Sequence, residues 1–314
     1  MARYVKVGVV APRPLDLNPQ QDMNACVDEM IAFWDSWLEH VLCDRPDLVV
    51  LPEVCDRPGN FSKDQQKAFY MARGDRIRDH FCAVAKTQNC NIAYSADRIM
   101  PDGTWRNSIQ FINRQGGLDG VYNKNHVTLG EFYDYNILYG KEAPVIKTDV
   151  GTVGGVICFD LNFQELREKY MRNRPEMLVF TSVYHGGLMQ NYWAYACKAY
   201  FIGCVSNDQC TVISPTGDLI AQSTNYYPFV TADINLDYRI VHIDYNREKF
   251  PALKQKYGSR VKIHDPGHLG CVLISSECDD LSIDEVIADF GLELWDDYYA
   301  RALADRHTAG HIEP

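Results

Sequence analysis

Short apolar runs rich in valine and isoleucine alternate along this chain with longer stretches in which apolar residues recur at helical spacing. A short β-branched run favours a strand, whereas apolar residues three and four positions apart favour a helix that buries one face. Helices that alternate with strands predict a layered α/β domain with the strands inside. A Pro-Asp-Gly turn at residues 101–103 joins neighbouring strands as an antiparallel pair, so we expect mixed sheets.

The expected elements run in order through most of the chain. We expect strands at residues 5–10, 48–51, 91–96, 108–113, 120–122, 145–148, 154–158, 177–180, 204–206, 211–214 and 230–234, and helices at 23–41, 65–86, 165–172 and 191–200. No repeat or low-complexity segment breaks residues 1–250, which we interpret as one domain. Residues 251–314 begin with a loop-like stretch and continue with an acidic helical pattern. We expect this C-terminal extension to be an oligomer arm or a surface wrap.

Composition and charge narrow the classes of function. The 314 residues are 46% hydrophobic and 23% charged, as in ordinary folded proteins. The 31 Lys and Arg against 42 Asp and Glu give a net charge of −11, which repels nucleic acid and anionic membranes. No apolar stretch approaches the roughly 18 residues of a membrane span, and the N-terminal run lacks a secretory pattern. Eleven cysteines without a Cys-x-x-Cys pair fit a reducing cytosol, so we expect a cytoplasmic location.

Three reactive side chains each follow an apolar run, at the strand end where ligands bind in open α/β sheets: Glu53, Lys124 and Cys158. Alone, each has an ordinary structural reading as a helix cap, a surface lysine or a packed thiol. Together they form a chemical set, because a thiolate attacks a carbonyl or nitrile carbon, a carboxylate takes its proton and an ammonium neutralises the oxyanion. A helix start after Cys158 favours the thiolate, and the Phe159 N–H is a second candidate oxyanion donor.

Three segments, Leu51-Pro-Glu53, Tyr122-Asn-Lys124-Asn-His126 and Gly154-Gly-Val-Ile-Cys158-Phe-Asp160, resemble in order and spacing the nitrilase superfamily of carbon–nitrogen hydrolases. The resemblance covers about residues 4–233. It implies that Glu53 is the general base, Lys124 the oxyanion stabiliser and Cys158 the nucleophile, which forms a thioester or thioimidate. Glu131 is the best match to the family's second glutamate, and Glu142 competes with it.

The resemblance also implies a fold and an assembly. The fold is a four-layer αββα sandwich with mixed sheets, whose protomers pair through their helices, so we expect a homo-oligomer, a dimer or a multiple of dimers. No metal or organic cofactor is implied. The histidine pairs His264/His268 and His307/His311 have helical spacing, but Pro-Gly forbids a helix in the first and the second lies near a terminus, so we predict no metal site.

Residues after the nucleophile favour one branch of the superfamily. True nitrilases usually place Trp-Glu there, whereas Phe159-Asp160 resembles the amidase and carbamoyl-hydrolase branches. We therefore predict a hydrolase of a small linear amide that releases ammonia through a thioester. Hydrolases of N-carbamoyl amino acids tend to place an Arg shortly after the Cys, and here Leu161-Asn162 follows, although Arg167 or another loop can replace it. An N-carbamoyl amide (ureido) hydrolase stays open as the alternative, with a nitrilase behind it.

Loops at the same sheet edge supply the expected substrate contacts: Phe159, Tyr133, Tyr184 and His185. The other reading of the aromatic residues is plain core or interface packing. Other classes of function also stay open. A Cys-His hydrolase with His126 or His185 as base has no role for Glu53 and Lys124. A catalytically silent scaffold or sensor need not keep all three reactive residues, and an amidotransferase half would need a phosphate loop that this chain lacks.

Overall fold

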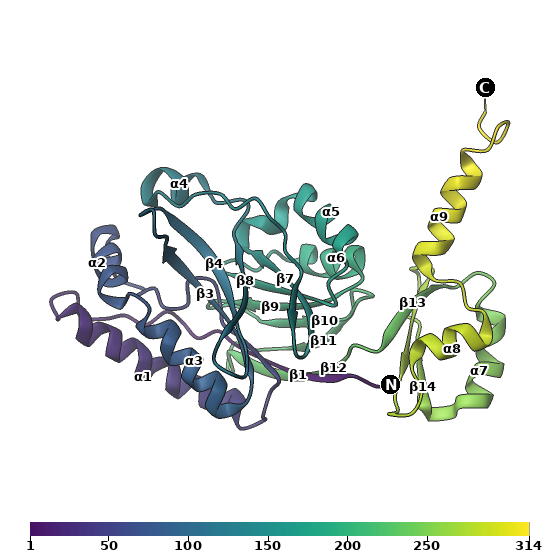
Figure 1. The fold of residues 1–314 in the computed structure, drawn as a ribbon, viewed down its shortest axis with the longest axis horizontal. Coiled ribbons are helices and arrows are strands. Elements are labelled where there is room, and N and C mark those ends of the chain that lie inside the picture. The colour runs from purple at the N-terminus through teal and green to yellow at the C-terminus, as the bar shows by residue number, and fades with distance from the viewer. Residues whose placement is uncertain (314) are drawn as a thin grey trace. The chain divides into compact units, whose positions relative to one another are not determined.

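Two six-stranded sheets lie face to face in the larger of two units of this chain, in a computed structural model that describes residues 1–313 (Figure 1). The first has the order β12-β1-β2-β3-β4-β5 and the second β11-β10-β9-β8-β7-β6. Their bounds are β1 Tyr4–Val10, β2 Leu48–Val50, β3 Asn91–Ile99, β4 Trp105–Ile112, β5 Leu118–Asn123, β6 Ile146–Thr148, β7 Gly151–Ile157, β8 Met177–Ser182, β9 Tyr200–Val205, β10 Thr211–Ile213, β11 Leu219–Gln222 and β12 Phe229–Asn235.

The two sheets pack closely at their inner faces. Thr181 of β8 donates a hydrogen bond to the Ser95 hydroxyl of β3 over 3.1 Å. A Cβ atom added to Gly155 of β7 would lie 2.6 Å from the Tyr122 ring of β5, so only a glycine lets this part of the sheets approach. Parallel and antiparallel pairs occur within each sheet, as the sequence predicts.

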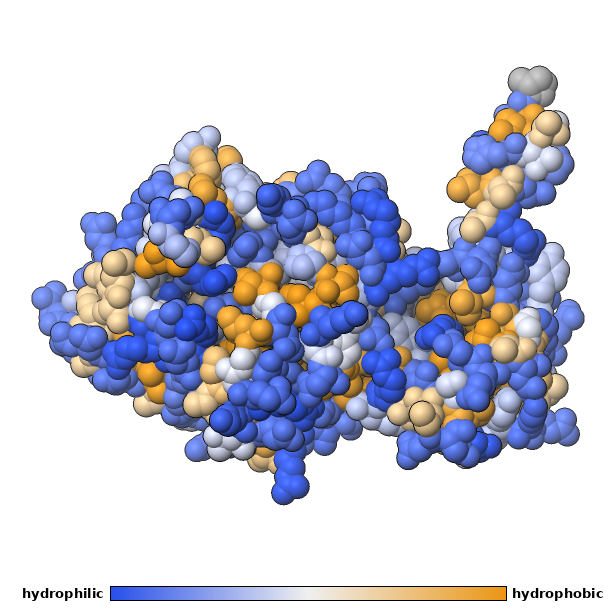
Figure 2. Space-filling view, viewed as in Figure 1, coloured by the Kyte–Doolittle hydropathy of each residue, from blue (hydrophilic) through white to orange (hydrophobic). Residues whose placement is uncertain are grey.

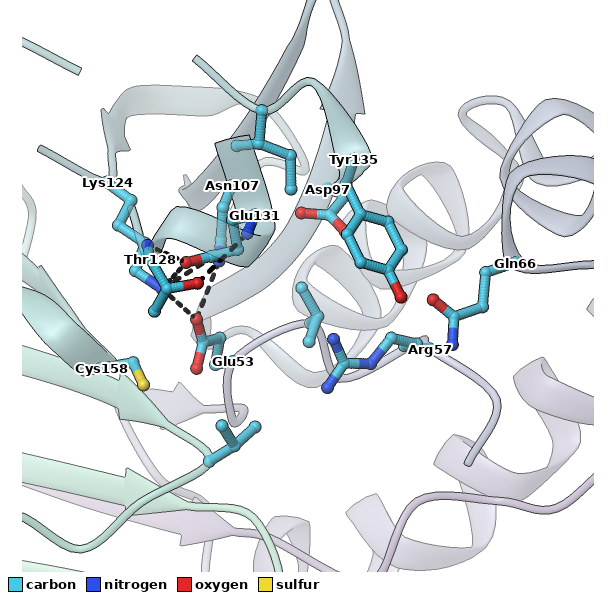
Figure 3. Close-up of a pocket in the computed structure, with 13 residues that line it drawn as sticks. Glu53, Arg57, Gln66, Asp97, Asn107, Lys124, Thr128, Glu131, Tyr135 and Cys158 are labelled. Atoms are coloured by element: carbon cyan, nitrogen blue, oxygen red, sulfur yellow. Dashed lines mark hydrogen bonds and ion pairs between the residues drawn. The ribbon is translucent and has the colours of Figure 1, made fainter. Parts of the chain in front are cut away.

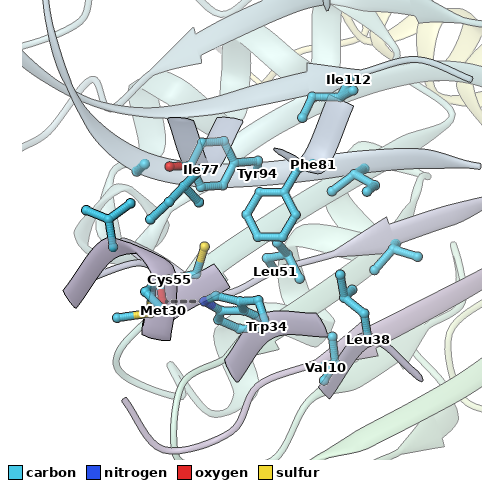
Figure 4. Packing of buried hydrophobic residues seen from close by; sticks show 14 of the residues in the cluster. Val10, Met30, Trp34, Leu38, Leu51, Cys55, Ile77, Phe81, Tyr94 and Ile112 are labelled. Atoms are coloured by element: carbon cyan, nitrogen blue, oxygen red, sulfur yellow. Dashed lines mark hydrogen bonds between the residues drawn. The ribbon is translucent and has the colours of Figure 1, made fainter. Parts of the chain in front are cut away.

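Helices cover the outer face of each sheet, which completes the predicted αββα sandwich (Figure 1). On the first sheet lie α1 (Met23–Leu42), α2 (Lys63–Arg73) and α3 (Arg76–Gln88), and on the second α5 (Gln164–Asn173) and α6 (Leu188–Cys197). In α1 the Asp22 carboxylate caps the first turn, and Met30, Trp34 and Leu38 share one buried face because they are four residues apart. Figure 4 shows this face packed against residues of the first sheet.

Two helices predicted from the sequence have different limits in the structure. The expected helix 65–86 is two helices, because Gly74 follows α2 with a φ of +49° and ends it. The expected helix 191–200 ends at Cys197, and Tyr200 already begins β9. Short helices that the sequence did not indicate, α4 (Leu129–Tyr135) and the 3-10 helix η1 (Cys158–Asn162), follow strand ends.

The smaller unit consists of residues 1–4 and 235–314, so the compact units divide at Asn235 rather than near residue 250. It has an antiparallel sheet of order β13-β15-β14 and its own apolar core. The sequence predicts a loop-like stretch at 251–268, but apolar residues there, such as Leu253 and Val261, pack into this core within a helix and a strand. The elements are β13 Tyr238–His242, η2 Arg247–Lys249, α7 Phe250–Tyr257, η3 Gly258–Arg260, β14 Val261–His264, β15 Cys271–Ser276, α8 Ile283–Phe290 and α9 Trp295–Arg306. The role of this unit as an oligomer arm or surface wrap stays a prediction.

The surface of each unit is mostly hydrophilic on the face drawn in Figure 2. Within the larger unit, the exposed large side chains include Leu129 and Tyr133 of α4. None of the helices formed by residues 1–313 combines the length and the apolar composition that crossing a membrane requires.

Candidate active site

Strand direction brings the predicted reactive residues to one sheet edge. β2 and β3 are parallel, β4 is antiparallel to β3, and β5 is antiparallel to β4, so β2, β3 and β5 all end at the same edge. Glu53 follows β2 and Lys124 directly follows β5, while Cys158 directly follows β7 in the facing sheet. All three line one cavity of about 180 Å³ (Figure 3). The spatial meeting of Glu53, Lys124 and Cys158 that the sequence implies is therefore present.

Lys124 is the centre of a buried charge cluster. Its Nζ lies 2.8 Å from Glu53 Oε1 and 2.8 Å from both carboxylate oxygens of Glu131, and its side chain is 1% exposed. Burial disfavours the ammonium, but the two carboxylates outweigh burial and hold the pKa of Lys124 above its usual range. Asn107 donates from Nδ2 to Glu53 over 2.8 Å and to Glu131 over 3.0 Å. The cluster is therefore charged and fixed before any ligand binds.

Glu131, rather than Glu142, is the second glutamate beside Lys124. It is the third residue of α4, where its Oε2 accepts a 2.7 Å hydrogen bond from the Thr128 N–H in a capping box. Burial opposes its ionisation, but Lys124 and these hydrogen bonds outweigh burial and lower the pKa of Glu131. Glu142 is exposed, and its carbonyl accepts from Asn125. One side chain thus fixes both the start of α4 and the lysine ammonium.

Cys158 sits on a strained strand-to-helix turn. Its φ is +47°, a left-handed conformation that costs energy for a residue with a Cβ. Burial, and next the Glu53 carboxylate, raise the pKa of Cys158 to about 12, against the opposing effects of Lys124 and of hydrogen bonds with Ser182 and the Val183 backbone. The thiol is therefore protonated at rest, and the helix start does not produce the thiolate that we expected.

The two carboxylate oxygens of Glu53 have different surroundings. One of its oxygens, Oε1, is held by Lys124 and Asn107, whereas Oε2 is buried and has no hydrogen-bond partner among the described residues. Figure 3 shows this second oxygen on the side of the carboxylate that faces Cys158. This oxygen is therefore open to a hydrogen bond or a proton from a group in the cavity.

Asp160 connects the lysine segment to the cysteine turn. Its Oδ2 accepts from the Ile157 N–H over 3.0 Å and from the Tyr122 hydroxyl over 2.6 Å. Its Oδ1 accepts from the His126 N–H over 2.7 Å. Tyr122 and His126 flank Lys124, so one buried carboxylate sets the spacing of Lys124 and Cys158.

The cavity extends away from the thiol to a second group of polar side chains, which we call the far end: Arg57, Gln66, Asp97 and Tyr135. We call Glu53, Lys124, Glu131 and Cys158 the thiol end. Neither the far end nor Asn107 is predicted from the sequence. Asp97 and Asn107 are directly opposite each other in β3 and β4. Two polar residues paired in buried strands were the sequence feature that could have indicated this part of the site. The expected strand stopped at residue 96, one short of Asp97.

The predicted substrate contacts do not line this cavity. Tyr133 of α4 is 73% exposed and Phe159 is 38% exposed. The Tyr184 hydroxyl accepts a 3.0 Å hydrogen bond from Asn162, and His185 lines a separate cavity with Gln190. Within residues 1–313, no group of three or more His, Cys, Asp or Glu side chains is arranged to hold a metal ion.

A family model described as "Carbon-nitrogen hydrolase" matches residues 20–240. The chain is 27% identical over 134 residues to the omega-amidase NIT2 of Xenopus tropicalis, which is 37% of this chain and 47% of that protein. It thus spans about half or less of the length of the curated omega-amidases it matches.

Solved structures share the fold. Nit3 of Saccharomyces cerevisiae, described as a member of branch 10 of the nitrilase superfamily, matches with a TM-score of 0.61 and 18% identity, over 82% of this chain and 95% of Nit3. An amidase from Nesterenkonia sp. matches with a TM-score of 0.57 and 14% identity, over 81% of this chain and 96% of the amidase.

Proposed function

Because this chain belongs to the carbon–nitrogen hydrolase family, we propose that it is a cysteine-dependent hydrolase of a small linear amide that releases ammonia through a thioester. Family membership confirms the resemblance that the three sequence segments indicate. Amide hydrolysis at this coarse level agrees with the amidase and omega-amidase relatives. The observation that carries the finer proposal is the buried cluster in which Lys124 bonds both Glu53 and Glu131 beside the Cys158 thiol.

In the first half of the proposed reaction the thiol becomes acylated. Glu53 Oε2 takes the proton from Sγ as Sγ attacks the amide carbon, and the Lys124 ammonium and the Phe159 N–H stabilise the negative oxygen that forms. The intermediate collapses as the C–N bond breaks. The proton on Glu53 passes to the leaving nitrogen, which departs as ammonia, and the acyl group stays on Cys158 as a thioester.

In the second half water frees the enzyme. Glu53 takes a proton from a water molecule, whose oxygen attacks the thioester carbon. The C–S bond breaks, the carboxylic acid leaves and the proton returns from Glu53 to Sγ. A protonated resting thiol fits this cycle, because the proton that starts the reaction comes from Cys158 itself.

Ammonia release from a panel of linear amides, N-carbamoyl compounds and nitriles tests the proposal. We expect release from amides, its loss in Cys158→Ala, and an acyl adduct on Cys158 that mass spectrometry detects after rapid quenching. Ammonia release from nitriles alone, or from N-carbamoyl compounds alone, would indicate that the protein has the activity of another branch of the superfamily. An absence of both ammonia and adduct across the panel would favour a catalytically silent scaffold.

A further inference from the structure

We propose that the far end of the cavity binds the α-amino acid end of the substrate, with its carboxylate on Arg57 and its ammonium on Asp97. The inference rests on the proposed function, because the amide of such a substrate lies at the thiol end. The substrate class is then the side-chain amides of α-amino acids. Two charged groups of the far end carry this inference.

Arg57 presents an unused cation to the cavity. It lies in the loop after β2, four residues beyond Glu53, and Figure 3 shows its guanidinium pointing into the cavity. Among residues 1–313 its side chain has no hydrogen bond and no ion pair, although Asp97 and Glu53 lie near enough to influence its pKa. A planar guanidinium matches the two oxygens of a carboxylate, so an anionic ligand group complements it.

Asp97 presents a carboxyl group with an unbonded oxygen to the same cavity. The residue is 4% exposed, and its Oδ1 has no hydrogen-bond donor within the described part of the chain. Buried Arg73 is already engaged, since it donates to Asp56 over 2.7 Å and to the Asp97 backbone carbonyl over 2.5 Å. A buried carboxylate oxygen without a donor is costly, and a ligand ammonium supplies the missing hydrogen bond and charge.

The presence of both groups selects a ligand with both charges. A ligand with only a carboxylate would bind Arg57, but its carboxylate would be repelled by Asp97. A ligand with only an ammonium would bind Asp97, but its ammonium would be repelled by Arg57. An N-carbamoyl amino acid lacks the ammonium, because its nitrogen is acylated. The cavity of about 180 Å³ is below the roughly 300 Å³ at which pockets for drug-sized ligands begin, so it suits a molecule as small as an amino acid.

Two series of amides that differ only in charge test the inference. The longer series is glutamine, glutaramate, 4-aminobutanamide and butanamide, which carry both charges, the carboxylate, the ammonium and neither charge. The shorter series is built in the same way on asparagine. In at least one series we expect kcat/KM for the zwitterion to exceed that of each singly charged or neutral amide by about 10- to 100-fold, as one or two charged hydrogen bonds predict.

Single-residue variants test which side chain produces the preference for the zwitterionic amide. Arg57→Gln should remove the advantage that the carboxylate gives, and Asp97→Asn the advantage that the ammonium gives, chiefly through KM. Arg172→Gln, which removes an exposed arginine of α5, is the matched control and should keep the preference. Equal efficiency for a neutral and a zwitterionic amide, or an unchanged preference in both variants, overturns the inference.

Binding separates this inference from the proposed reaction. Calorimetry on Cys158→Ala should show glutamine or asparagine binding that weakens about 10-fold or more when Arg57→Gln is added. Binding of this kind without ammonia release would overturn the proposed reaction and keep the far-end assignment. Ammonia release from amides that is indifferent to charge would do the reverse.

Discussion

Charged side chains are paired with one another at the thiol end of the cavity and, among the residues that the structure describes, are not paired with one another at the far end. At the thiol end, Lys124 bonds both Glu53 and Glu131, and Asn107 bonds both carboxylates as well. At the far end, Arg57 and Asp97 line the same cavity, yet no ion pair joins these two described residues. Paired charges keep their geometry without a ligand, which suits groups that stabilise a transition state. Unpaired charges gain partners only when a ligand arrives, which suits recognition.

The largest expected effect follows from removal of the cation at the thiol end. Lys124→Met leaves the Glu53 and Glu131 carboxylates buried without their cation, so we expect unfolding free energy to fall by about 3–5 kcal/mol and amidase activity to be lost. Denaturant unfolding and ammonia release measure the two effects. Lys147→Met, at an exposed position of β6, is the control. Stability close to that of the unchanged protein would contradict the idea that the cluster is charged.

Replacing the proposed base separates its two effects on the thiol. In Glu53→Gln we expect amide hydrolysis to fall by about 10²- to 10⁴-fold, because no group takes the proton. The pKa of Cys158 should fall at the same time, since the Glu53 carboxylate helps to raise it to about 12, so iodoacetamide should label Cys158 faster at pH 8. Labelling of exposed Cys43 is the internal reference and Glu39→Gln the control variant. Slower labelling of Cys158 would reverse the assigned sign.

At the far end, Asp97→Asn should stabilise the protein in a pH-dependent way. Burial raises the pKa of Asp97 from 3.8 to about 7. The folded state therefore binds this proton more tightly than the unfolded state, and stability falls as pH rises from about 4 to about 7. We expect Asp97→Asn to gain about 4 kcal/mol over the parent protein at pH 8 and little at pH 4, from unfolding curves at both values. A gain that is equal at both pH values would contradict this explanation.

The smallest expected effect concerns Glu131. Glu131→Gln keeps an oxygen near Lys124, and Glu53 still pairs with the ammonium, so we expect about a tenfold loss of kcat, roughly 1.4 kcal/mol, with the fold intact. Steady-state kinetics beside Glu142→Gln, the exposed competitor, measures it. A loss as large as that of Glu53→Gln would show that Glu131 takes part in proton transfer.

Reactive residues at strand ends were predictable because local pattern marks both the strand and its end. Glu53 follows Leu-Val-Val-Leu-Pro, and Cys158 ends the apolar run from Val153. The far end gave weaker signals. Arg57 lies in a loop, where apolar periodicity does not predict side-chain direction. Asp97 could be recognised as a site residue only together with Asn107, its partner across the β3–β4 pair.

The sequence by itself determined the alternation of strand and helix, the family and the three reactive residues, because apolar periodicity and short motifs are local properties of a chain. Only the tertiary structure decided which glutamate meets Lys124, that Cys158 rests as a protonated thiol, and that Arg57 and Asp97 face one cavity without pairing. Burial and the distance between charges set these features, and both depend on segments far apart in sequence that pack together only in the folded chain.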